Sequence, residues 1–571
     1  MRYFLFRMTV YAGLTVLGFC LFRVQVLEGG RFRRLSEQNR VRLIPLEAPR
    51  GRVFDSRGNL LATNRPSYDV VATPEDVTPE VFPRLATILQ LSEKEVRRRM
   101  SAPREYPFAP ALIKEDVPRE VLFRIEEYKP ELPGVFIQIA FLRYYPYQET
   151  ASHLIGFIGK INSEEYQKLD RERYGFNSLI GRTGIEKIYD ERLRGWRGGR
   201  QIEVNARGQL VRVLSEKLPE PGEDLRLTLD LDFQKKIMEF IKGKHASVAV
   251  MDLDSEGLIA LASSPAFDPN VFVSPGRAQE RLQFLRDVNA PLLDRGVSSA
   301  YPPGSVFKLV TALAALETGK ITPNTRFFCP GTFRLKPGAR PYHCWSQHGH
   351  GSINLYEALE RSCNVYFYNV GSRLSPETIA SYARELGLGE RMRLDVTNIA
   401  PGLVPDSAWK RERFREKWYQ GETLSFAIGQ SYLLVSPLQV LRLTAIIAKN
   451  GVRVEPQLIL EKNPSDESKK TAIHEENLKV IKKGMLQVVQ SEYGTGQLAR
   501  VDFGKLAAKT GTAQVPPPKT AHSWMTGFFP YDNPKIAFVV FVEHGGSGGI
   551  TGAKIVKEMI QIWGENVAKV G

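Results

Sequence analysis

The first 27 residues constrain the chain most, because they suit a bilayer better than a protein core. The segment from Met8 to Phe22, "MTVYAGLTVLGFCLF", carries no charge, and Arg7 and Arg23 flank it. Basic side chains can extend toward the polar surface, so the stretch from Phe4 to Leu27 is long enough to span the hydrocarbon. No small-residue cleavage site follows Phe22, which favours an uncleaved anchor over a signal peptide. We predict a short cytoplasmic stub and one transmembrane helix within residues 1–27.

The composition of the whole chain indicates several globular domains behind this anchor. Of its 571 residues, 43% are hydrophobic and 25% are charged, and the net charge is +15. The basic residues are scattered and carry no nucleic-acid-binding signature, so we expect no nucleic-acid partner. A membrane surface or an anionic polymer would suit the same positive charge.

The charges around the predicted span do not decide its orientation. Arg2 and Arg7 precede it, and six arginines follow it closely: Arg23, Arg31, Arg33, Arg34, Arg40 and Arg42. Counting these charges would place the large domain inside the cell. A long folded domain can nevertheless be translocated regardless of flanking charge, so the count is not decisive.

Residues 28–220 have the pattern of an extended, strand-rich pedestal. They are rich in arginine, glycine and turn signals, and the short alternating stretches "SYDVVAT" and "GVFIQIAF" indicate strands. Three helical patterns interrupt them, at residues 80–91, 93–100 and 119–128. We therefore expect a pedestal with a small insert at about residues 75–142.

Residues 221–571 change in character and predict one large α+β domain. "ASVAVMDL" and "GLIALAS" indicate a β-hairpin, and "GKLAAKTGTAQV", "HSWMTGFFP" and "KIAFVVFVEH" indicate three strands near the end. Helical patterns lie around Ser305 and at residues 356–368, 378–386, 437–449 and 553–568. Strands at both ends with helices between them predict an antiparallel sheet covered by helices.

The stretch "SAYPPGSVFKLVTALAALE" suggests a nucleophile at the start of a helix. Ser305 would lie where free N–H groups and the helix dipole favour negative charge, with Lys308 one turn further on. A serine hydroxyl needs a base, and a lysine serves as one when burial or a second cation lowers its pKa. The same S-x-x-K spacing recurs at Ser407–Lys410 within "SAWKRERFREKW", so the motif alone is weak.

The segment "LAAKTGTAQ" offers the second cation. Lys509 begins Lys509-Thr510-Gly511-Thr512 on an expected strand, where Gly511 would let a substrate backbone approach and the threonines offer hydroxyls. The N–H groups of Thr512 and Ser305 would together form an oxyanion hole. The alternative is an ordinary sheet strand with an incidental lysine.

A Ser-x-Asn element should complete the site, and the chain offers two. Ser362 and Asn364 follow the helical pattern "LYEALERS", at a junction that can present a side chain to a cleft. Ser352 and Asn354 precede the same pattern, where capping the helix is their ordinary role. We assign Ser362 and Asn364 to the site.

Three elements in the order SxxK, SxN and KTG are far more specific than any one of them. With them the sequence resembles the penicilloyl-serine transferases, which comprise penicillin-binding proteins and serine β-lactamases. "APRGRVFDSRGNLLATN", "RYYPYQETASHLIGFIG" and "GRTGIEKIYDERLRG" are similar to pedestal motifs of class B penicillin-binding proteins, and most of these motifs are expected to be structural. "NRVRLIPLEAPRG" and the overall length look most like the elongation-specific penicillin-binding protein 2 group.

The resemblance implies a peptidoglycan D,D-transpeptidase that needs no cofactor for its chemistry and is acylated by β-lactams. Ser305 would attack the D-Ala-D-Ala bond of a stem peptide, with Lys308 as proton acceptor. Ser362 and Lys509 would serve the leaving group, Asn364 would orient the lysine and the peptide, and Thr510, Gly511 and Thr512 would bind substrate.

The resemblance also implies a cellular setting. It places the catalytic domain outside the cytoplasmic membrane, in cell elongation and shape maintenance. The implied partners are a SEDS-type membrane glycosyltransferase, touching the span and the pedestal, and other elongation-complex proteins. A carboxypeptidase or β-lactamase would use the same residues with water as acceptor. A non-catalytic β-lactam sensor or scaffold is the alternative from another class.

Three cysteines and a histidine form a candidate metal site next to these motifs. Cys329, Cys344, His350 and Cys363 have the spacing C-x14-C-x5-H-x12-C, enough ligands for tetrahedral zinc. A Cys329–Cys344 disulfide with a buried Cys363 is the alternative. Some enzymes of the resembled group carry zinc at the corresponding place, and His350 aligns with their histidine ligand. His343 and His348 remain substitutes for it.

Overall fold

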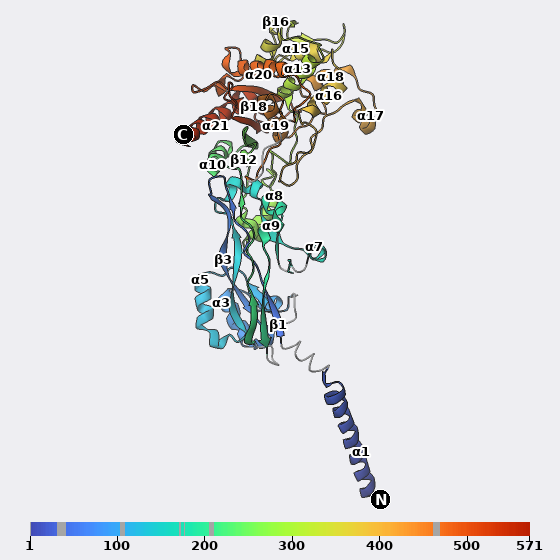
Figure 1. Cartoon of the computed structure of the whole chain (residues 1–571), viewed down its shortest axis with the longest axis vertical. Helices are drawn as coiled ribbons and strands as arrows, with labels where there is room; N and C mark the ends of the chain where they lie inside the picture. Colours follow the sequence, from blue (N-terminus) through green and yellow to red (C-terminus); the bar gives the residue numbers. More distant parts are fainter. Residues whose placement is uncertain are drawn as a thin grey trace.

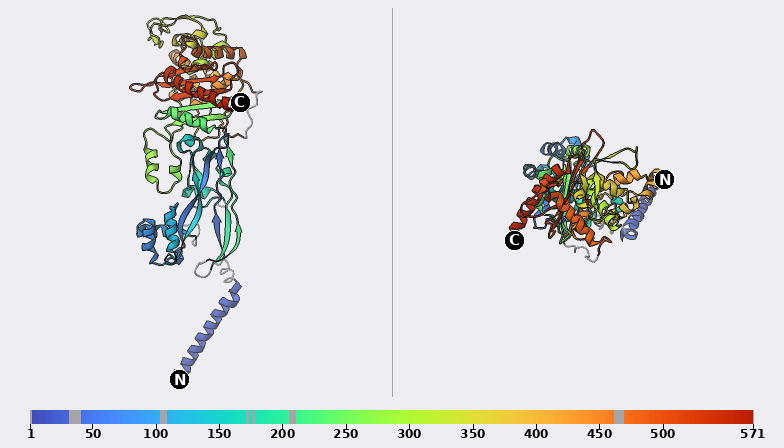
Figure 2. Two further views of the ribbon diagram at one scale, coloured as in Figure 1. Left: turned by 90° about the vertical axis from the view of Figure 1, so that its left-hand side faces the viewer. Right: turned by 90° about the horizontal axis from the view of Figure 1, so that it is seen from above.

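The chain folds into three successive parts: an N-terminal helix, an elongated pedestal, and a head at the C-terminal end (Figure 1). The computed structural model describes residues 2–30, 41–102, 109–170, 173–175, 178–204, 210–460 and 469–570. The arginine-rich residues 31–40 lie outside these ranges. Views from two further directions show the same succession of parts (Figure 2).

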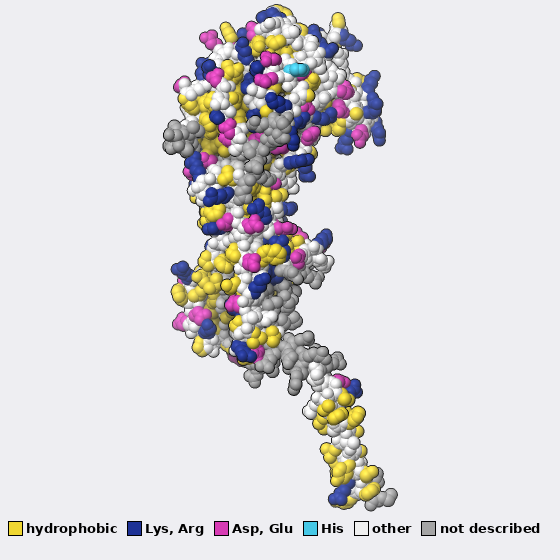
Figure 3. Space-filling model, in the orientation of Figure 1, with side chains coloured by type: hydrophobic (Ala, Val, Ile, Leu, Met, Phe, Trp, Pro, Cys, Tyr) yellow, Lys and Arg dark blue, Asp and Glu magenta, His cyan; other side chains and the backbone are white. Residues whose placement is uncertain are grey.

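The N-terminal part is a single apolar helix. It consists of α1 (Arg2–Phe22) and the π-helical turn η1 (Arg23–Leu27). Among the described residues, one helix is long and apolar enough to span a membrane, and it covers Phe6–Leu27. Its large apolar side chains are exposed along its length (Figure 3). This agrees with the span predicted from the sequence.

The pedestal is built around long strands, as predicted. The strand β3 pairs with β2 at its start, with β5 along most of its length and with β4 on the opposite edge at its end, and β10 extends the sheet beyond β2. A second sheet has the order β1-β8-β9, and β6 pairs with β7. The strands are β1 (Val41–Leu46), β2 (Val53–Phe54), β3 (Leu60–Ala72), β4 (Ala111–Lys114), β5 (Val135–Tyr144), β6 (Ile158–Lys160), β7 (Leu179–Gly181), β8 (Gly198–Val204), β9 (Leu210–Lys217) and β10 (Leu225–Arg226). The short helices of the pedestal are α6 (Ser152–Ile155), α7 (Ser163–Lys168), α8 (Gly184–Ile188) and α9 (Asp190–Arg194).

A small helical insert with its own core lies between β3 and β5. Its helices are α3 (Val81–Leu89), α4 (Glu93–Met100) and α5 (Arg119–Glu127), close to the predicted ranges. Ser92 begins α4 by accepting a hydrogen bond from the Glu95 N–H, which satisfies a free donor of the first turn. The sequence-based boundary put much of β5 inside this insert, whereas β5 pairs with β3 over ten residues and belongs to the long sheet.

The three pedestal motifs found in the sequence meet in one buried ion-pair network. Arg50 donates to Glu186 at 2.8 Å and to Asp190 at 2.9 Å, and Arg143 donates to Glu186 at 2.6 Å. Burial alone would raise the pKa of Glu186, but the two guanidinium groups outweigh it and hold the pKa below its ordinary value. The motifs therefore have a structural role that joins distant pedestal segments.

The head contains an antiparallel sheet with the order β12-β11-β19-β18-β17, as the sequence predicts. The hairpin of β11 and β12 and the three late strands are all confirmed. Their bounds are β11 (Ala246–Asp252), β12 (Leu258–Ser264), β17 (Ala507–Ala513), β18 (His522–Phe529) and β19 (Ile536–Val542). Four shorter strands are β13 (Phe327–Cys329), β14 (Thr332–Phe333), β15 (Tyr342–His343) and β16 (Gly351–Ile353).

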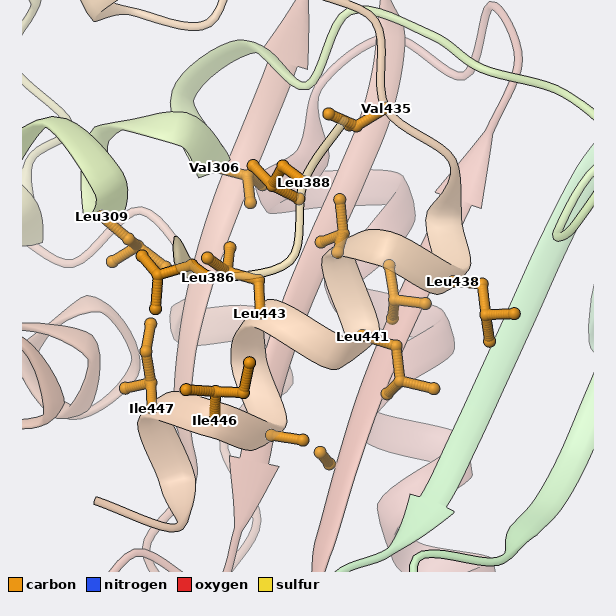
Figure 4. Close-up of a cluster of buried hydrophobic side chains, with 14 of the residues drawn as sticks. Val306, Leu309, Leu386, Leu388, Val435, Leu438, Leu441, Leu443, Ile446 and Ile447 are labelled. Atoms are coloured by element: carbon orange, nitrogen blue, oxygen red, sulfur yellow. The ribbon is translucent and has the colours of Figure 1, made fainter. Parts of the chain in front are cut away.

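Helices cover both faces of this sheet. On one face α19 packs its leucines and isoleucines against Val306, Leu309 and neighbouring apolar side chains (Figure 4). On the other face α10 and α21 enclose a second core. The head helices are α10 (Leu231–Ile241), α11 (Asn270–Val273), α12 (Ala278–Arg286), α13 (Lys308–Glu317), α14 (Leu355–Glu360), α15 (Asn364–Gly371), α16 (Pro376–Glu385), α17 (Ser407–Phe414), α18 (Gln420–Ala427), α19 (Pro437–Ala448), α20 (Glu475–Gln490) and α21 (Ala553–Val570).

Two helices differ from the sequence-based expectation in ways that matter for the site. The helical pattern at residues 356–368 is two helices, because Ser362 adopts a left-handed backbone conformation with φ +52° between α14 and α15. Ser305 lies on the 3-10 turn η5 (Gly304–Phe307), and the α-helix begins only at Lys308. Both differences place a serine at a break between helical segments.

Candidate active site

The turn that carries Ser305 is held in place by tight backbone contacts. Gly304 has φ +54°, and a Cβ atom there would lie 3.0 Å from the carbonyl oxygen of Thr512. The Gly304 N–H donates to the carbonyl of Gly429 at 3.0 Å, and Trp524 Nε1 donates to the carbonyl of Pro302 at 3.0 Å. Because only glycine fits this approach, the turn lies directly against the strand that carries Thr512.

Lys308 is fully buried and extends from α13 toward the break at Ser362. Its Nζ donates to the Ser362 carbonyl oxygen at 2.7 Å, to Ser362 Oγ at 3.3 Å and to Asn364 Oδ1 at 2.7 Å. These acceptors are all neutral. Burial therefore lowers the pKa of Lys308 to about 8, although Cys363 and Cys344 act in the opposite direction.

Lys509 reaches the same hydroxyl from the sheet. Its Nζ donates to Ser362 Oγ at 2.9 Å and to the Thr510 carbonyl at 2.9 Å, and its side chain is fully buried. Burial, reinforced by the positive charge of Lys308, lowers the pKa of Lys509 well below its ordinary value. Two lysines from distant segments thus meet at one serine oxygen.

The strand β17 presents Lys509 and Thr510 at the edge of the sheet. It pairs only with β18 in the sheet, so its other edge faces the turn η5. Gly511 lies in the crowded part of this contact, where a Cβ atom would come 3.0 Å from the Pro303 carbonyl oxygen. An edge strand with free backbone groups can take an extended peptide as an additional strand.

Ser305 itself is half-buried on the turn η5, which contacts both α13 and β17, the elements that carry the two lysines. Within the described ranges its hydroxyl makes no hydrogen bond, and the donors of Lys308 are directed to Ser362 and Asn364. Catalytic hydrogen bonds often tighten only when substrate is bound, so this arrangement corresponds to a resting site. Hydrogen bonds join four of the predicted residues, Lys308 of α13, Ser362 at the break before α15, Asn364 of α15 and Lys509 of β17. Ser305 lies on the adjoining turn η5, which contacts β17.

Three contacts of this site had no signal in the sequence. Thr495 Oγ1 and Thr510 Oγ1 form a hydrogen bond of 2.7 Å, which fixes the Thr510 hydroxyl. Gly429 and Trp524 hold the turn before Ser305, as described above. None of these three residues belongs to a spaced motif, and only the folded chain brings them to the site.

The competing motifs have structural roles. Lys410, the lysine of the second S-x-x-K, donates to Glu422 at 2.5 Å. Asn354, from the competing Ser-x-Asn, begins α14 by exchanging hydrogen bonds with Glu357 in a capping box. Ser352 lies on β16 and accepts from Arg326.

The three cysteines of the head and His350 form a compact cluster beside Ser362. The sulfur atoms of Cys329, Cys344 and Cys363 and a ring nitrogen of His350 all lie within 4.8 Å of one another. His350 Nδ1 is 3.6 Å from the sulfurs of Cys329 and of Cys344. All three cysteines are free, so the alternative Cys329–Cys344 disulfide is not formed. His343 instead accepts the Asn364 Nδ2–H through its backbone carbonyl at 3.2 Å.

Comparison with known families matches both large parts of the chain. Residues 246–561 match the penicillin binding protein transpeptidase domain, and residues 45–227 match the penicillin-binding protein dimerisation domain. The chain belongs to the penicillin-binding protein family. In this penicillin-binding protein the dimerisation-domain match covers the pedestal from the end of β1 to β10, and the transpeptidase match covers the S-x-x-K, S-x-N and K-T-G motifs of the head.

Relatives of this penicillin-binding protein are similar over nearly their whole length. The peptidoglycan D,D-transpeptidase MrdA of Escherichia coli strain K12 is 31% identical, over 93% of this chain and 89% of MrdA. PBP2 of Helicobacter pylori, in a complex with MreC, is 30% identical with a TM-score of 0.84, covering 92% of this chain and 99% of that one. A third relative is a chain from the structure "Structural coordination of polymerization and crosslinking by a peptidoglycan synthase complex". It is 30% identical with a TM-score of 0.74, and the match covers 99% of this chain and 98% of that one.

Proposed function

We propose that this chain is a peptidoglycan D,D-transpeptidase that cross-links stem peptides through an acyl-enzyme on Ser305. The observation that carries the proposal is the meeting of Lys308 Nζ and Lys509 Nζ at Ser362 Oγ, at 3.3 and 2.9 Å, beside the Ser305 turn. The membership in the penicillin-binding protein family and the similarity to MrdA support the same activity.

Acylation begins with attack of Ser305 Oγ on the carbonyl carbon of the D-Ala-D-Ala bond. Lys308 in its neutral form accepts the hydroxyl proton, which its lowered pKa makes possible near neutral pH. The N–H groups of Ser305 and Thr512 would stabilise the negative oxygen that develops, since Gly304 packs against the Thr512 carbonyl and brings the two segments together.

Departure of D-Ala requires a proton on its amine. Ser362 Oγ lies between the two lysine amines, so it can relay a proton from Lys509 to the leaving nitrogen. Thr510, with its hydroxyl fixed by Thr495, and Lys509 would bind the terminal carboxylate. Asn364 holds Lys308 through its Oδ1 atom and leaves its amide to orient the peptide.

The second half-reaction transfers the acyl group to an amine of another stem peptide. The proton that Lys308 took from Ser305 first passes through Ser362 to Lys509, which gave its own proton to D-Ala, so Lys308 is neutral again. Lys308 then accepts the proton of the attacking amine and returns it to Ser305 Oγ as the tetrahedral intermediate collapses, which gives ping-pong kinetics. A D,D-carboxypeptidase or β-lactamase would complete the same cycle with water. The pedestal and the similarity to MrdA over nearly the whole chain favour the cross-linking enzyme.

Mass spectrometry of penicillin-treated protein tests this proposal. We expect one penicilloyl group per chain, on the peptide that contains Ser305, and none on the Ser305→Ala protein. Acylation that persists in Ser305→Ala, or that maps to another serine, would overturn the assignment. Product analysis with stem-peptide donor and amine acceptor then distinguishes a cross-linked dimer from hydrolysed tetrapeptide.

The cellular setting belongs to the same proposal. The apolar helix α1 anchors the chain in the cytoplasmic membrane with its N-terminus inside and the head outside, where peptidoglycan lies. The related PBP2 in complex with MreC and the related chain of a peptidoglycan synthase complex support partners from the elongation machinery. A SEDS-type glycosyltransferase would contact α1 and the pedestal. Fusion of a periplasmic reporter to the C-terminus tests the topology.

The cysteine cluster supports a second proposal, a structural Zn²⁺ ion held by Cys329, Cys344, Cys363 and His350. In a tetrahedral site with Zn–S bonds of ~2.3 Å, two ligand sulfur atoms lie about 3.8 Å apart. A ligand sulfur and a ligand nitrogen lie about 3.6 Å apart. Here Cys344 and Cys363 are 4.0 Å apart, and the two sulfur–nitrogen distances are both 3.6 Å. The donor set and its spacing fit zinc, and the ion would fix the loop that carries Ser362 and Asn364.

Metal analysis tests the zinc proposal independently of activity. Protein purified without chelator should contain about one zinc per chain, and Cys329→Ser should lose most of it. Thiol titration of the denatured protein should find all of its cysteines reduced. Wild-type protein that lacks stoichiometric zinc and shows oxidised thiols would overturn the proposal.

A further inference from the structure

The helix α17 and the loop after α18 form an exposed surface that the catalytic site does not use. It contains the second S-x-x-K run, whose serine and lysine take no part in the chemistry. Three aromatic side chains gather there, Trp409, Phe414 and Tyr432, with three arginines around them, Arg411, Arg413 and Arg415. We call these six residues the aromatic–basic platform.

The aromatic rings of the platform pack on one another and remain partly open to solvent. Ring centroids are 5.1 Å apart for Trp409 and Tyr432, 5.4 Å for Phe414 and Tyr432, and 5.6 Å for Trp409 and Phe414. Phe414 is 46% exposed, which is high for a large apolar side chain in a packed cluster. An open aromatic cluster of this kind is typical of a binding surface rather than of a core.

The arginines of the platform are exposed, and the run 410–417 that contains them carries five basic residues and two acidic ones, Glu412 and Glu416. None of the three forms an ion pair with a residue in the described part of the chain, whereas the neighbouring Lys410 is paired with Glu422 and Glu416. Arg413 lies one helical turn after Trp409, and Arg411 one turn before Phe414, so two of the three arginines lie on the same faces of α17 as its aromatic residues. Figure 3 shows Lys and Arg side chains gathered at the outer edge of the head, where Figure 1 places α17.

The platform is connected to the nucleophile turn by a short stretch of backbone. Gly429, whose carbonyl accepts from the Gly304 N–H next to Ser305, is three residues before Tyr432. Three residues of extended chain span about 10 Å at most. A ligand on the platform therefore lies close enough to belong to the same molecule as a peptide at Ser305.

The position of the platform in the molecule indicates which kind of ligand it meets. It is part of the head, and the pedestal separates it from the membrane helix α1, so lipid headgroups are not the anion it meets (Figure 1). The polymer presented to a peptidoglycan transpeptidase has sugar rings with apolar C–H faces and stem peptides with free carboxylates. Aromatic side chains can pack against the apolar faces of the sugar rings, and arginines can pair with the carboxylates of the stem peptides.

We propose that the aromatic–basic platform binds the peptidoglycan strand itself, stacking on its sugars and pairing with its stem carboxylates, and so holds polymer beside the cleft. This inference rests on the proposed transpeptidase function. It predicts that substitutions on the platform weaken binding to the polymer and leave the reaction with a small substrate unchanged.

Sedimentation with purified sacculi tests this inference. The full-length protein would carry Ser305→Ala, so that no covalent attachment contributes to binding. Removing three exposed cation–carboxylate contacts with Arg411→Gln, Arg413→Gln and Arg415→Gln should weaken binding about tenfold at low salt. A matched control removes three exposed lysines around α10 and α21, with Lys242→Gln, Lys554→Gln and Lys557→Gln, and should stay within about twofold of wild type. Phe414→Ala should weaken binding to glycan strands stripped of their stem peptides.

Several results would overturn the platform. One is a triple arginine variant that binds sacculi as well as the parent protein does. If that variant also lost binding to an acidic protein, the platform would be a protein-binding surface and not a polymer-binding one. Another is an equal loss in the lysine control. Penicillin acylation, measured with Ser305 intact, should be the same in all variants. If wild-type Ser305 were not acylated, the proposed function would fail, whatever the sacculus measurement showed.

Discussion

The two S-x-x-K segments of this chain have the same spacing and opposite roles. Lys308 and Lys410 are both buried, but Lys308 meets only the neutral oxygens of Ser362 and Asn364, whereas Lys410 meets the carboxylate of Glu422. Burial lowers the pKa of Lys308. Burial acts on Lys410 too, but the Glu422 carboxylate outweighs it and raises the pKa. The difference shows that burial lowers the pKa of a lysine when no carboxylate compensates it.

The serines differ in the same instructive way. Ser305 lies on a 3-10 turn pressed against the sheet edge, with the Lys308–Ser362–Lys509 group behind it. Ser407 is the first residue of α17, directly after the capping residue Asp406, and the lysine of its motif is paired with Glu422. The following experiments compare the two segments, from the largest expected effect to the smallest.

Replacing the two serines should give the largest contrast. Ser305→Ala should abolish covalent labelling by fluorescent penicillin, because the nucleophile is gone, while Ser407→Ala should label at the wild-type rate. The measurement is gel fluorescence after denaturation, with circular dichroism to show that both variants fold. Equal labelling of the two proteins would contradict the assignment of Ser305.

Replacing the two lysines should separate catalysis from stability. Lys308→Ala should slow acylation by about 10²–10⁴-fold, since a positioned general base is lost. Lys410→Met should leave the acylation rate nearly unchanged but lower the melting temperature, because Glu422 loses its partner. Stopped-flow acylation and thermal unfolding of both variants measure this. A loss of acylation in Lys410→Met at a temperature where it is folded would break the comparison.

The pH dependence should follow the lysine with the lowered pKa. The base must be neutral, so below about pH 8 the acylation rate should fall about tenfold per pH unit, and above it the rate should level off. The measurement is the second-order rate constant for penicillin acylation between pH 6 and 9, with an unfolding control at each pH. A rate that stays flat from pH 6 to 8 would show that Lys308 is not the titrating base.

The smallest effect is expected at the second Ser-x-Asn element. Asn354→Ala removes the cap of α14 and should lower the free energy of unfolding by about 1 kcal/mol, with acylation unaffected. Asn364→Ala should instead reduce acylation, because Lys308 loses an acceptor that positions it. Denaturant unfolding and acylation rates of both variants would show whether the two asparagines divide structure and function in this way.

Much of the fold followed from local patterns in the sequence. The period of the β11–β12 hairpin and of the three late strands, and the approximate ranges of α4, α19 and α21, are local properties, and the structure confirms them. The end of the pattern "LYEALERS" placed Ser362 at a junction, but no local pattern indicated that a positive φ at this serine divides residues 356–368 into two helices.

The site was predictable to the extent that its residues form spaced motifs. Ser305, Ser362 and Lys509 were selected because three weak motifs occur in one order. Thr495, Gly429 and Trp524 have no such spacing, and their positions depend on which segments pack together. The sequence was enough to name the three cysteines of the cluster. It offered three nearby histidines, and only the folded chain shows that the ring of His350 is the one that lies among the sulfur atoms.

The length of β3 has a consequence for where cross-links are made. At about 3.3 Å per residue, its 13 residues extend over roughly 43 Å along the pedestal, from Leu61 in the core shared with the head to Val70 and Ala72 in the core of the insert. In the topology proposed above, this strand acts as a fixed spacer that sets the depth of wall the enzyme can treat. A chain with a shortened spacer would keep intact chemistry and yet be unable to reach the layer in which new strands must be joined.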